Sequence, residues 1–144
     1  MKNRGFTLIE LLVTIAVIVI VSTIAVPNFQ SLIASNRAAS DFNEILAGLK
    51  YARAEAIKCR GDVTFEITNG NGWNYSVTSV DCANIRDMQR TSQRGAADEA
   101  IIVFGPLGKS SCPGGGCSIS VGGRTIHVYS TGYMGSLDTP EPES

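Results

Sequence analysis

The chain carries two hydrophobic patterns, one after the other. Residues 11–36 contain no Lys, Arg, Asp or Glu and are predominantly apolar. Between Phe29 and Ile57, apolar residues recur at spacings of three and four, which is typical of an amphipathic helix. Together the two patterns predict one helix over residues 6–58, apolar all round in its first half and amphipathic in its second half.

Beyond residue 58 the pattern becomes that of strands. Five short segments alternate between apolar and polar residues or are mainly apolar: residues 63–67, 73–77, 100–104, 118–121 and 125–129. Turn-forming residues 69–72 separate the first two segments, and Gly122-Gly123 separates the last two, which predicts two hairpins. We expect an α+β fold in which an antiparallel sheet packs on the amphipathic half of the helix.

Three aromatic residues take alternate positions on the first predicted hairpin: Phe65, Trp73 and Tyr75. Alternate positions share one face of a sheet. We interpret this face as one that packs on the helix, and an aromatic platform for a ligand is the alternative.

The apolar half is long enough to cross a membrane. Residues 6–26 provide about 20 residues of helix, or about 30 Å, which matches a bilayer core. Lys2 and Arg4 precede this segment, so the positive-inside rule leaves the N-terminus in the cytoplasm. A secretory signal peptide is the alternative, but the helical pattern continues where such a peptide would end. Pro27 removes a backbone hydrogen bond to the carbonyl of Thr23 and predicts a kink.

Glu10 is the one acid near the start of the apolar segment. A carboxylate at membrane depth costs about 2.5–3.5 kcal/mol on insertion scales, so it usually has a partner or a function. No basic residue follows Glu10 within the segment. A partner must therefore come from outside the segment or from a charge made by processing. The alternative is a position shallow enough to reach the lipid headgroups.

The stretch Gly5-Phe6-Thr7-Leu8-Ile9-Glu10 resembles the class III signal of type IV pilin-like proteins. The resemblance implies that a prepilin peptidase cleaves between Gly5 and Phe6 and that Phe6 becomes N-methylated. It also implies an assembly role for Glu10, whose carboxylate can pair with the new amine of a neighbouring subunit. Two charges that are each costly when buried alone then act as a register device.

Other parts of the chain are similar to the FimT/GspH family of minor pilins and pseudopilins. They are the helical residues 25–29 and 51–58 and the glycine-containing turns at residues 104–108 and 130–132. The resemblance implies a type IV pilin-like fold and a structural subunit that contacts other pilins or pseudopilins through its N-terminal helix. We expect a minor pilin that takes part in assembly of a type IV pilus. A GspH-like pseudopilin of a type II secretion system is the alternative.

These inferences divide the chain into four parts. We expect a leader at residues 1–5, a membrane-spanning assembly helix at residues 6–27, a periplasmic domain at residues 28–136 and a flexible acidic tail at residues 137–144. The expected localisation is a single pass of the bacterial inner membrane with the C-terminal domain in the periplasm. The subunit would then enter a pilus or pseudopilus filament.

Four cysteines lie in the exported part: Cys59, Cys82, Cys112 and Cys117. An oxidising compartment favours disulfides among them. Of the three possible pairings we expect Cys112 with Cys117, which closes a Pro-Gly-Gly-Gly loop, and therefore Cys59 with Cys82. A zinc site is the alternative, but the sequence has no C-x-x-C and a single histidine, His127. We expect neither a metal nor a cofactor.

DNA is a further candidate partner, since some FimT members bind DNA for uptake through a Gly-Arg-x-Arg motif near the C-terminus. The matching place here reads Gly132-Tyr133-Met134-Gly135, without either arginine. The candidate DNA-binding residues are therefore Arg86, Arg90, Arg94 and Arg124. The first three, spaced four apart, would line one side of a short helix, although a solvated segment between strands has the same appearance. Without Lys2 and Arg4 the chain is net acidic, which argues against general affinity for DNA.

Catalytic motifs are absent from the sequence. It contains no G-x-S-x-G, P-loop or dinucleotide-binding fingerprint. His127 has no sequence pattern around it that identifies a nucleophile and an orienting group. We expect a protein that is processed by an enzyme and is not one itself.

Overall fold

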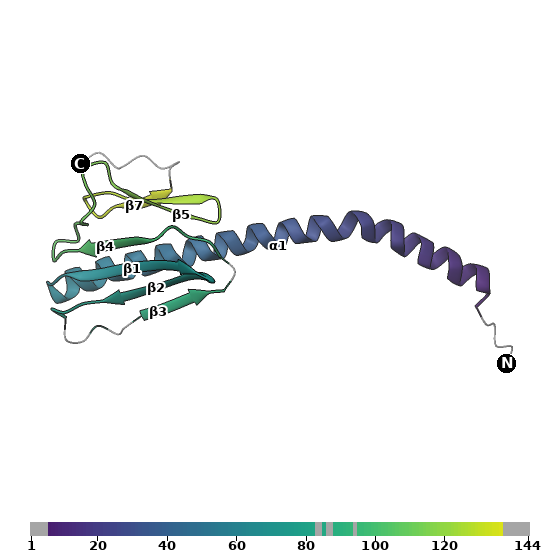
Figure 1. Cartoon of the computed structure of the whole chain (residues 1–144), viewed down its shortest axis with the longest axis horizontal. Helices are drawn as coiled ribbons and strands as arrows, with labels where there is room; N and C mark the ends of the chain where they lie inside the picture. Colours follow the sequence, from purple (N-terminus) through teal and green to yellow (C-terminus); the bar gives the residue numbers. More distant parts are fainter. Residues whose placement is uncertain (1–5, 83–84, 86–87, 94, 137–144) are drawn as a thin grey trace. The chain divides into compact units, whose positions relative to one another are not determined.

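The computed structural model describes residues 6–82, 85, 88–93 and 95–136. The chain divides into two compact units, one up to Asn36 and one from Arg37 onward. A single helix, α1 (Leu8–Cys59), supplies residues to both units (Figure 1). The long helix predicted from the sequence is confirmed, with its start two residues later and its end one residue later than residues 6–58.

In the second unit α1 buries one face. The buried residues recur at the spacing of an amphipathic helix: Ile45, Gly48, Leu49, Ala52 and Ala56. The helix ends in a Schellman motif, in which Arg60 adopts a φ of 54° and the backbone N–H of Gly61 donates to the carbonyl of Ala56 at 3.3 Å. Lys58 in the last turn complements the negative end of the helix dipole.

Four antiparallel strands form the first sheet. They are β1 (Val63–Gly70), β2 (Gly72–Thr78), β3 (Met88–Ser92) and β4 (Ala100–Phe104), in the order β3-β2-β1-β4. The predicted first hairpin is confirmed, but its strands run through the expected turn and pair Gly70 with Gly72. Gly72 has a φ of 118°, and a β-carbon there would collide with the carbonyl of Ser92, so this position requires glycine.

Three strands form a second sheet where the sequence analysis expects one sheet. They are β5 (Cys117–Val121), β6 (Arg124–Val128) and β7 (Met134–Ser136), in the order β5-β6-β7. The predicted second hairpin is confirmed as β5 and β6. Between the sheets, Ala97 bridges to Val121, and the backbone of Asp98 donates to the carbonyl of Ser120 at 2.9 Å. Strand β7 is too short to show an alternating pattern.

The aromatic residues of the first hairpin lie in the core. Phe65 and Tyr75 are fully buried and Trp73 is 2% exposed. The Tyr75 ring packs directly on the helix backbone, since a β-carbon at Gly48 would stand 2.7 Å from two of its ring carbons. The packing interpretation is therefore confirmed, and the alternative of an exposed ligand platform is wrong.

The helix considered for residues 86–94 is also wrong over its central part. Residues 88–92 form strand β3, whose Met88, Arg90 and Ser92 pair with Val77, Tyr75 and Trp73 of β2. Pairing with β2 fixes this segment, because its own sequence has weak preference for either structure. Arg86 and Arg94 lie outside the described residues. The acidic tail at residues 137–144 also lies outside them.

Candidate functional site

The first turn of α1 brings Thr7 and Glu10 together. The hydroxyl oxygen of Thr7 accepts a hydrogen bond from the backbone N–H of Glu10 at 3.3 Å. In return, the Glu10 carboxylate accepts from the backbone N–H and the hydroxyl of Thr7, each at 3.4 Å. This reciprocal arrangement is a capping box, and it places the carboxylate at the positive end of the helix dipole. Glu10 therefore has local donors within its own chain. Gly5 lies outside the described residues.

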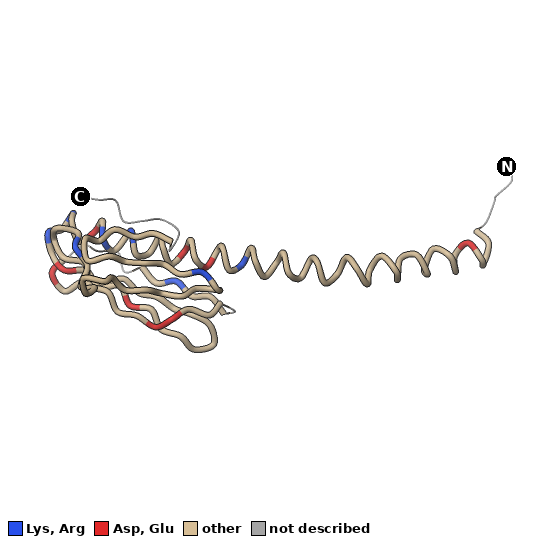
Figure 2. The backbone as a smooth tube through the Cα atoms, turned by 90° about the horizontal axis from the view of Figure 1, so that it is seen from above, with Lys and Arg blue, Asp and Glu red and all other residues tan. Residues whose placement is uncertain are grey.

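The rest of the first unit is an uncharged apolar surface. Its large apolar side chains are all exposed, from 46% for Ile33 to 83% for Phe6. The helix is long and apolar enough to cross a membrane. In Figure 2 the helix of the first unit carries red only near its start, where Glu10 lies, and no charge colour from there to residue 36, whereas both signs are interspersed in the second unit. An apolar surface of this extent requires lipid or other helices around it.

Polar side chains in this surface bond to the backbone of their own helix. Thr14, Ser22, Thr23, Asn28 and Ser31 donate to the carbonyls of Leu11, Ile18, Ile20, Ile24 and Asn28, at 2.7–3.2 Å. Such bonds satisfy a polar group without any partner outside the helix, which an apolar environment demands. Glu10 differs from these residues, because it carries the one ionisable side chain between residues 6 and 36.

Pro27 lies within α1, and the helix continues through it without interruption. The backbone of Pro27 has no N–H for the carbonyl of Thr23. The kink expected at this point stays a prediction.

A junction in the second unit brings together three segments that the sequence analysis singles out. Arg53 of α1 donates from Nε to the carbonyl of Gly108 at 3.0 Å. Gly108 has a φ of 74°, and Gly132 packs so closely on it that a β-carbon at Gly132 would collide with the Gly108 carbonyl. Gly132 itself closes a turn through a backbone hydrogen bond to Tyr129 at 2.8 Å. The helix and the two glycine-containing turns thus meet at one point of the domain.

Arg90, one of the candidate DNA-binding residues, is held by an acid. Its Nε lies 3.3 Å from Oε1 of Glu44 on α1, and its Nη1 donates to the carbonyl of Gln89 at 3.1 Å. The same Glu44 oxygen accepts from the hydroxyl of Tyr75 at 3.2 Å. Burial, followed by the nearby Glu44 carboxylate, raises the pKa of Tyr75 to about 12. Glu44 therefore cross-links α1 to β2 and β3, and it neutralises the charge that Arg90 would offer a phosphate.

Arg124 differs from Arg90 in its surroundings. It is exposed at the start of β6 and, in the part of the chain that the structure describes, forms no ion pair. Of the two candidate DNA-binding arginines that the structure describes, Arg124 alone is without an ion pair, and a single arginine is a weak basis for binding a nucleic acid, whose affinity comes from several phosphate contacts together.

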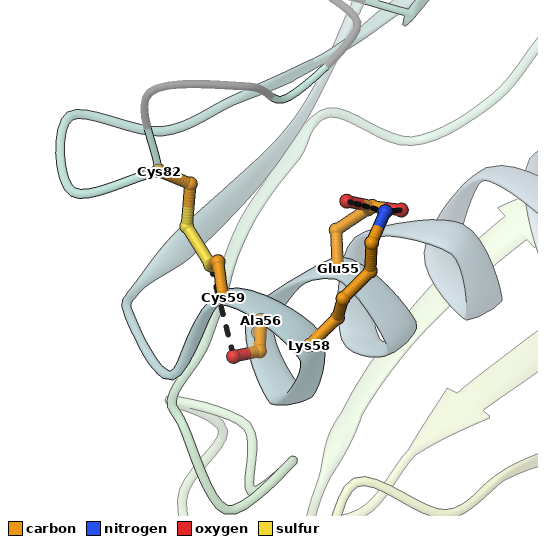
Figure 3. Close-up of polar contacts among 5 residues, drawn as sticks. All are labelled: Glu55, Ala56, Lys58, Cys59 and Cys82. Carbon is orange, nitrogen blue, oxygen red and sulfur yellow. Dashed lines mark hydrogen bonds and ion pairs between the residues drawn. A yellow bond between two sulfur atoms is a disulfide. The ribbon is translucent and has the colours of Figure 1, made fainter.

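The structure pairs Cys59 with Cys82 and Cys112 with Cys117, with Cα–Cα distances of 5.7 and 5.4 Å. The first disulfide joins the last residue of α1 to the loop after β2 (Figure 3). Near it, Lys58 and Glu55 form an ion pair at 3.1 Å. The two disulfides leave no cysteine free.

His127 lies on β6 between the cross-strand neighbours Ser118 and Gly135. Its ring centroid is 6.2 Å from that of Tyr129, and its Nε2 is buried without a hydrogen-bond partner among the described residues. Within those residues there is also no group of three or more His, Cys, Asp or Glu that could hold a metal ion.

The roles of Thr7 and Glu44 were not predicted from the sequence. Thr7 was recognisable, because Thr-x-x-Glu before an apolar run is the signature of a capping box. Glu44 was not, because its contacts with Tyr75 and Arg90 depend on the register of β2 and β3 against the helix.

Comparison with protein families gives two matches. Residues 1–26 match the prokaryotic N-terminal methylation motif, which covers Gly5, Phe6 and Glu10. Residues 41–132, more than half of the chain, match the family described as type II transport protein GspH. This second match includes the buried half of α1 and the junction around Arg53. No solved structure matches the chain.

Proposed function

Because the chain belongs to the GspH family of type IV pilin-like proteins, we propose that it is a pseudopilin subunit of a type II secretion system. Members of this family are structural proteins and not enzymes. The observation that carries the proposal is the match of residues 41–132 to a type II transport family. A minor pilin of a type IV pilus, the role expected from the sequence, becomes the second candidate, since both roles share the same helix chemistry.

The methylation motif implies processing by a prepilin peptidase. We propose that cleavage between Gly5 and Phe6 removes the basic leader, and that residues 6–27 then remain in the inner membrane. Lys2 and Arg4 would hold the leader on the cytoplasmic side, with residues 28–136 in the periplasm. The mass of the mature chain tests this route, because a chain that begins at any residue other than Phe6 would contradict it.

We further propose that Glu10 changes partners on assembly. In the single chain its carboxylate accepts from Thr7 at 3.4 Å, which is long for a hydrogen bond to a charged group. The amine that cleavage creates at Phe6 of a neighbouring subunit is a stronger partner, because it carries a full positive charge. Removal of one member of a buried ion pair costs about 3–5 kcal/mol, so this single contact can decide whether a subunit enters a filament.

A deletion strain separates the two candidate roles. Loss of exoprotein release with surface pili retained is the result expected for a pseudopilin. Loss of surface pili with exoprotein release retained would contradict the proposal and establish the minor pilin role. Complementation with the wild-type chain is the control for effects on neighbouring genes, and complementation with Glu10→Ala tests whether the phenotype depends on assembly.

A further inference from the structure

A groove of about 360 Å³ lies beside the junction of Arg53 with the glycine turns. Helix α1 contributes Lys50, Arg53 and Ile57 to it, and the segment that leads into β7 contributes Gly132, Tyr133 and Met134. Ile57 is 46% exposed there, although it belongs to the apolar series of the helix. We call this feature the Lys50 groove.

The two cations of the Lys50 groove have no acidic partner among the described residues. Among the described residues, the ion pairs join Lys58 to Glu55 and Arg90 to Glu44, and neither involves Lys50 or Arg53. Lys50 and Arg53 are three residues apart on α1, a spacing at which like charges repel each other. One turn further along, the helix places Ala54 and Ile57 beside them, not an acid. Arg53 uses Nε for the Gly108 carbonyl, and its two terminal amino groups form no ion pair with a described residue.

A complementary segment of the same chain begins close by. Residues 137–144 contain Asp138, Glu141 and Glu143 and no basic residue. They follow directly after β7, whose first residue, Met134, lines the groove. An extended chain covers about 3.3–3.6 Å per residue, so Glu141 has a reach of about 17 Å from Ser136. The return from Ser136 to Met134 is about 7 Å. The segment is therefore long enough to turn back into the groove.

We propose that the acidic segment 137–144 docks in the Lys50 groove of its own chain. Its carboxylates neutralise Lys50 and Arg53, and its prolines favour the extended conformation in which peptides occupy shallow grooves. Because the paired charges are near the surface, the docking is reversible and weakens as salt is added. The docked segment covers the exposed part of Ile57 and keeps other anions away from the groove. The proposal is independent of whether the subunit serves secretion or a pilus.

Amine labelling of the full-length protein in detergent tests the proposal. A limiting amount of a reductive methylation reagent is applied, and modification of Lys50, Lys58 and Lys109 is quantified by mass spectrometry. We expect Lys50 to react at least about threefold more slowly in the wild type than in Asp138→Asn/Glu141→Gln/Glu143→Gln, and this difference to vanish at about 0.5 M salt. Lys58 and Lys109 serve as controls within the same chain and should react equally in both proteins. An unchanged rate at Lys50 would overturn the proposal.

Carbodiimide cross-linking distinguishes the possible occupants. It joins a lysine amine to a nearby carboxylate, and an equal mixture of ¹⁵N-labelled and unlabelled chains identifies the source of each partner. We expect Lys50 to link to Asp138, Glu141 or Glu143 of a chain with the same label. Links between differently labelled chains would show that the segment binds a second copy, and would overturn docking within one chain. Equal protection of Lys50 by an added oligonucleotide in wild type and triple variant would also overturn it, because the groove would then be open.

Discussion

Gly132 is a position at which we expect a single added methyl group to destabilise the domain strongly. Replacement by alanine places a β-carbon against the carbonyl of Gly108 and 2.9 Å from Nε of Arg53. The residue also has a φ of 82°, which side chains rarely adopt. Gly123 offers a matched control, because its φ is 83° and a β-carbon there has no neighbour within 4 Å. The two substitutions share their backbone strain and differ in the collision.

The expected magnitudes follow from this comparison. A left-handed conformation costs an alanine about 1–2 kcal/mol, and reduced freedom of the unfolded chain offsets about 0.4–1 kcal/mol of that. Gly123→Ala should therefore lower the free energy of unfolding by about 1 kcal/mol. Gly132→Ala adds overpacking of about 1–3 kcal/mol and displaces the carbonyl that Arg53 binds, so we expect a loss of about 3–4 kcal/mol.

Urea unfolding of the domain from residue 28 onward measures both losses. The buried core residues lie at or after Ile45, so this fragment contains them. Trp73 is the single tryptophan and is 2% exposed, and its fluorescence therefore reports loss of the core. Equal losses in Gly132→Ala and Gly123→Ala would refute the reasoning, because they would show that the turns separate at no cost and that the junction does not hold the domain together.

Four further predictions concern the core, the cysteines, the helix start and DNA. The pKa of Tyr75 is raised from 10.0 to about 12, so the neutral phenol contributes stability that is fully present below pH 10. About 2–3 kcal/mol of the free energy of unfolding should be lost as the pH rises to about 12, and the pH dependence of unfolding of Tyr75→Phe should lack this loss. Loop-closure entropy predicts that Cys59→Ser/Cys82→Ser, whose disulfide spans a sequence separation of 23, lowers the free energy of unfolding by about 3 kcal/mol. Cys112→Ser/Cys117→Ser, with a separation of 5, should lower it by about 2 kcal/mol, and equal denaturation midpoints of the two variants would contradict this difference. Glu10→Ala should still enter the membrane but fail to join sheared filaments, whereas Thr7→Val should reduce incorporation only partly; wild-type incorporation of Glu10→Ala would exclude the pairing role. The domain should bind DNA no more tightly than about 10⁻⁴ M at physiological salt, and low-micromolar binding that is lost in Arg86→Ala/Arg90→Ala/Arg94→Ala would reverse this expectation.

The sequence predicts those elements whose hydrophobic pattern lies entirely within their own residues. The spacing from Ile45 to Ala56 determines the buried face of α1, and the alternation around residues 65–75 determines the first hairpin. Both signals are local, because one face of each element is buried and the other is not. The capping box of Thr7 and Glu10 is local in the same sense.

Other features depend on contacts between distant residues and have no local pattern. Strand β3 exists because β2 offers it an edge, and the sequence Met-Gln-Arg-Thr-Ser alone favours neither helix nor strand strongly. The link between the two sheets runs through residues 96–98, whose backbone contacts residues 120–122 far along the chain. The Lys50 groove likewise requires α1 and the turn at Gly132 to be placed in three dimensions.

The backbone-bonded polar side chains of the first unit have a consequence for how such helices assemble. Thr14, Ser22, Thr23, Asn28 and Ser31 direct their donors inward, so they provide few directional contacts to an adjacent helix. Dispersion between apolar side chains has no donor or acceptor direction, so it selects the position of one helix against another less sharply than an ion pair does. On the role proposed for Glu10, the position of a subunit in a growing filament is therefore set mainly where its Glu10 carboxylate pairs with the Phe6 amine of a neighbour. Subunits with different outer domains can share one filament under this rule, because the helix surface specifies where a subunit stops and not which subunit it is.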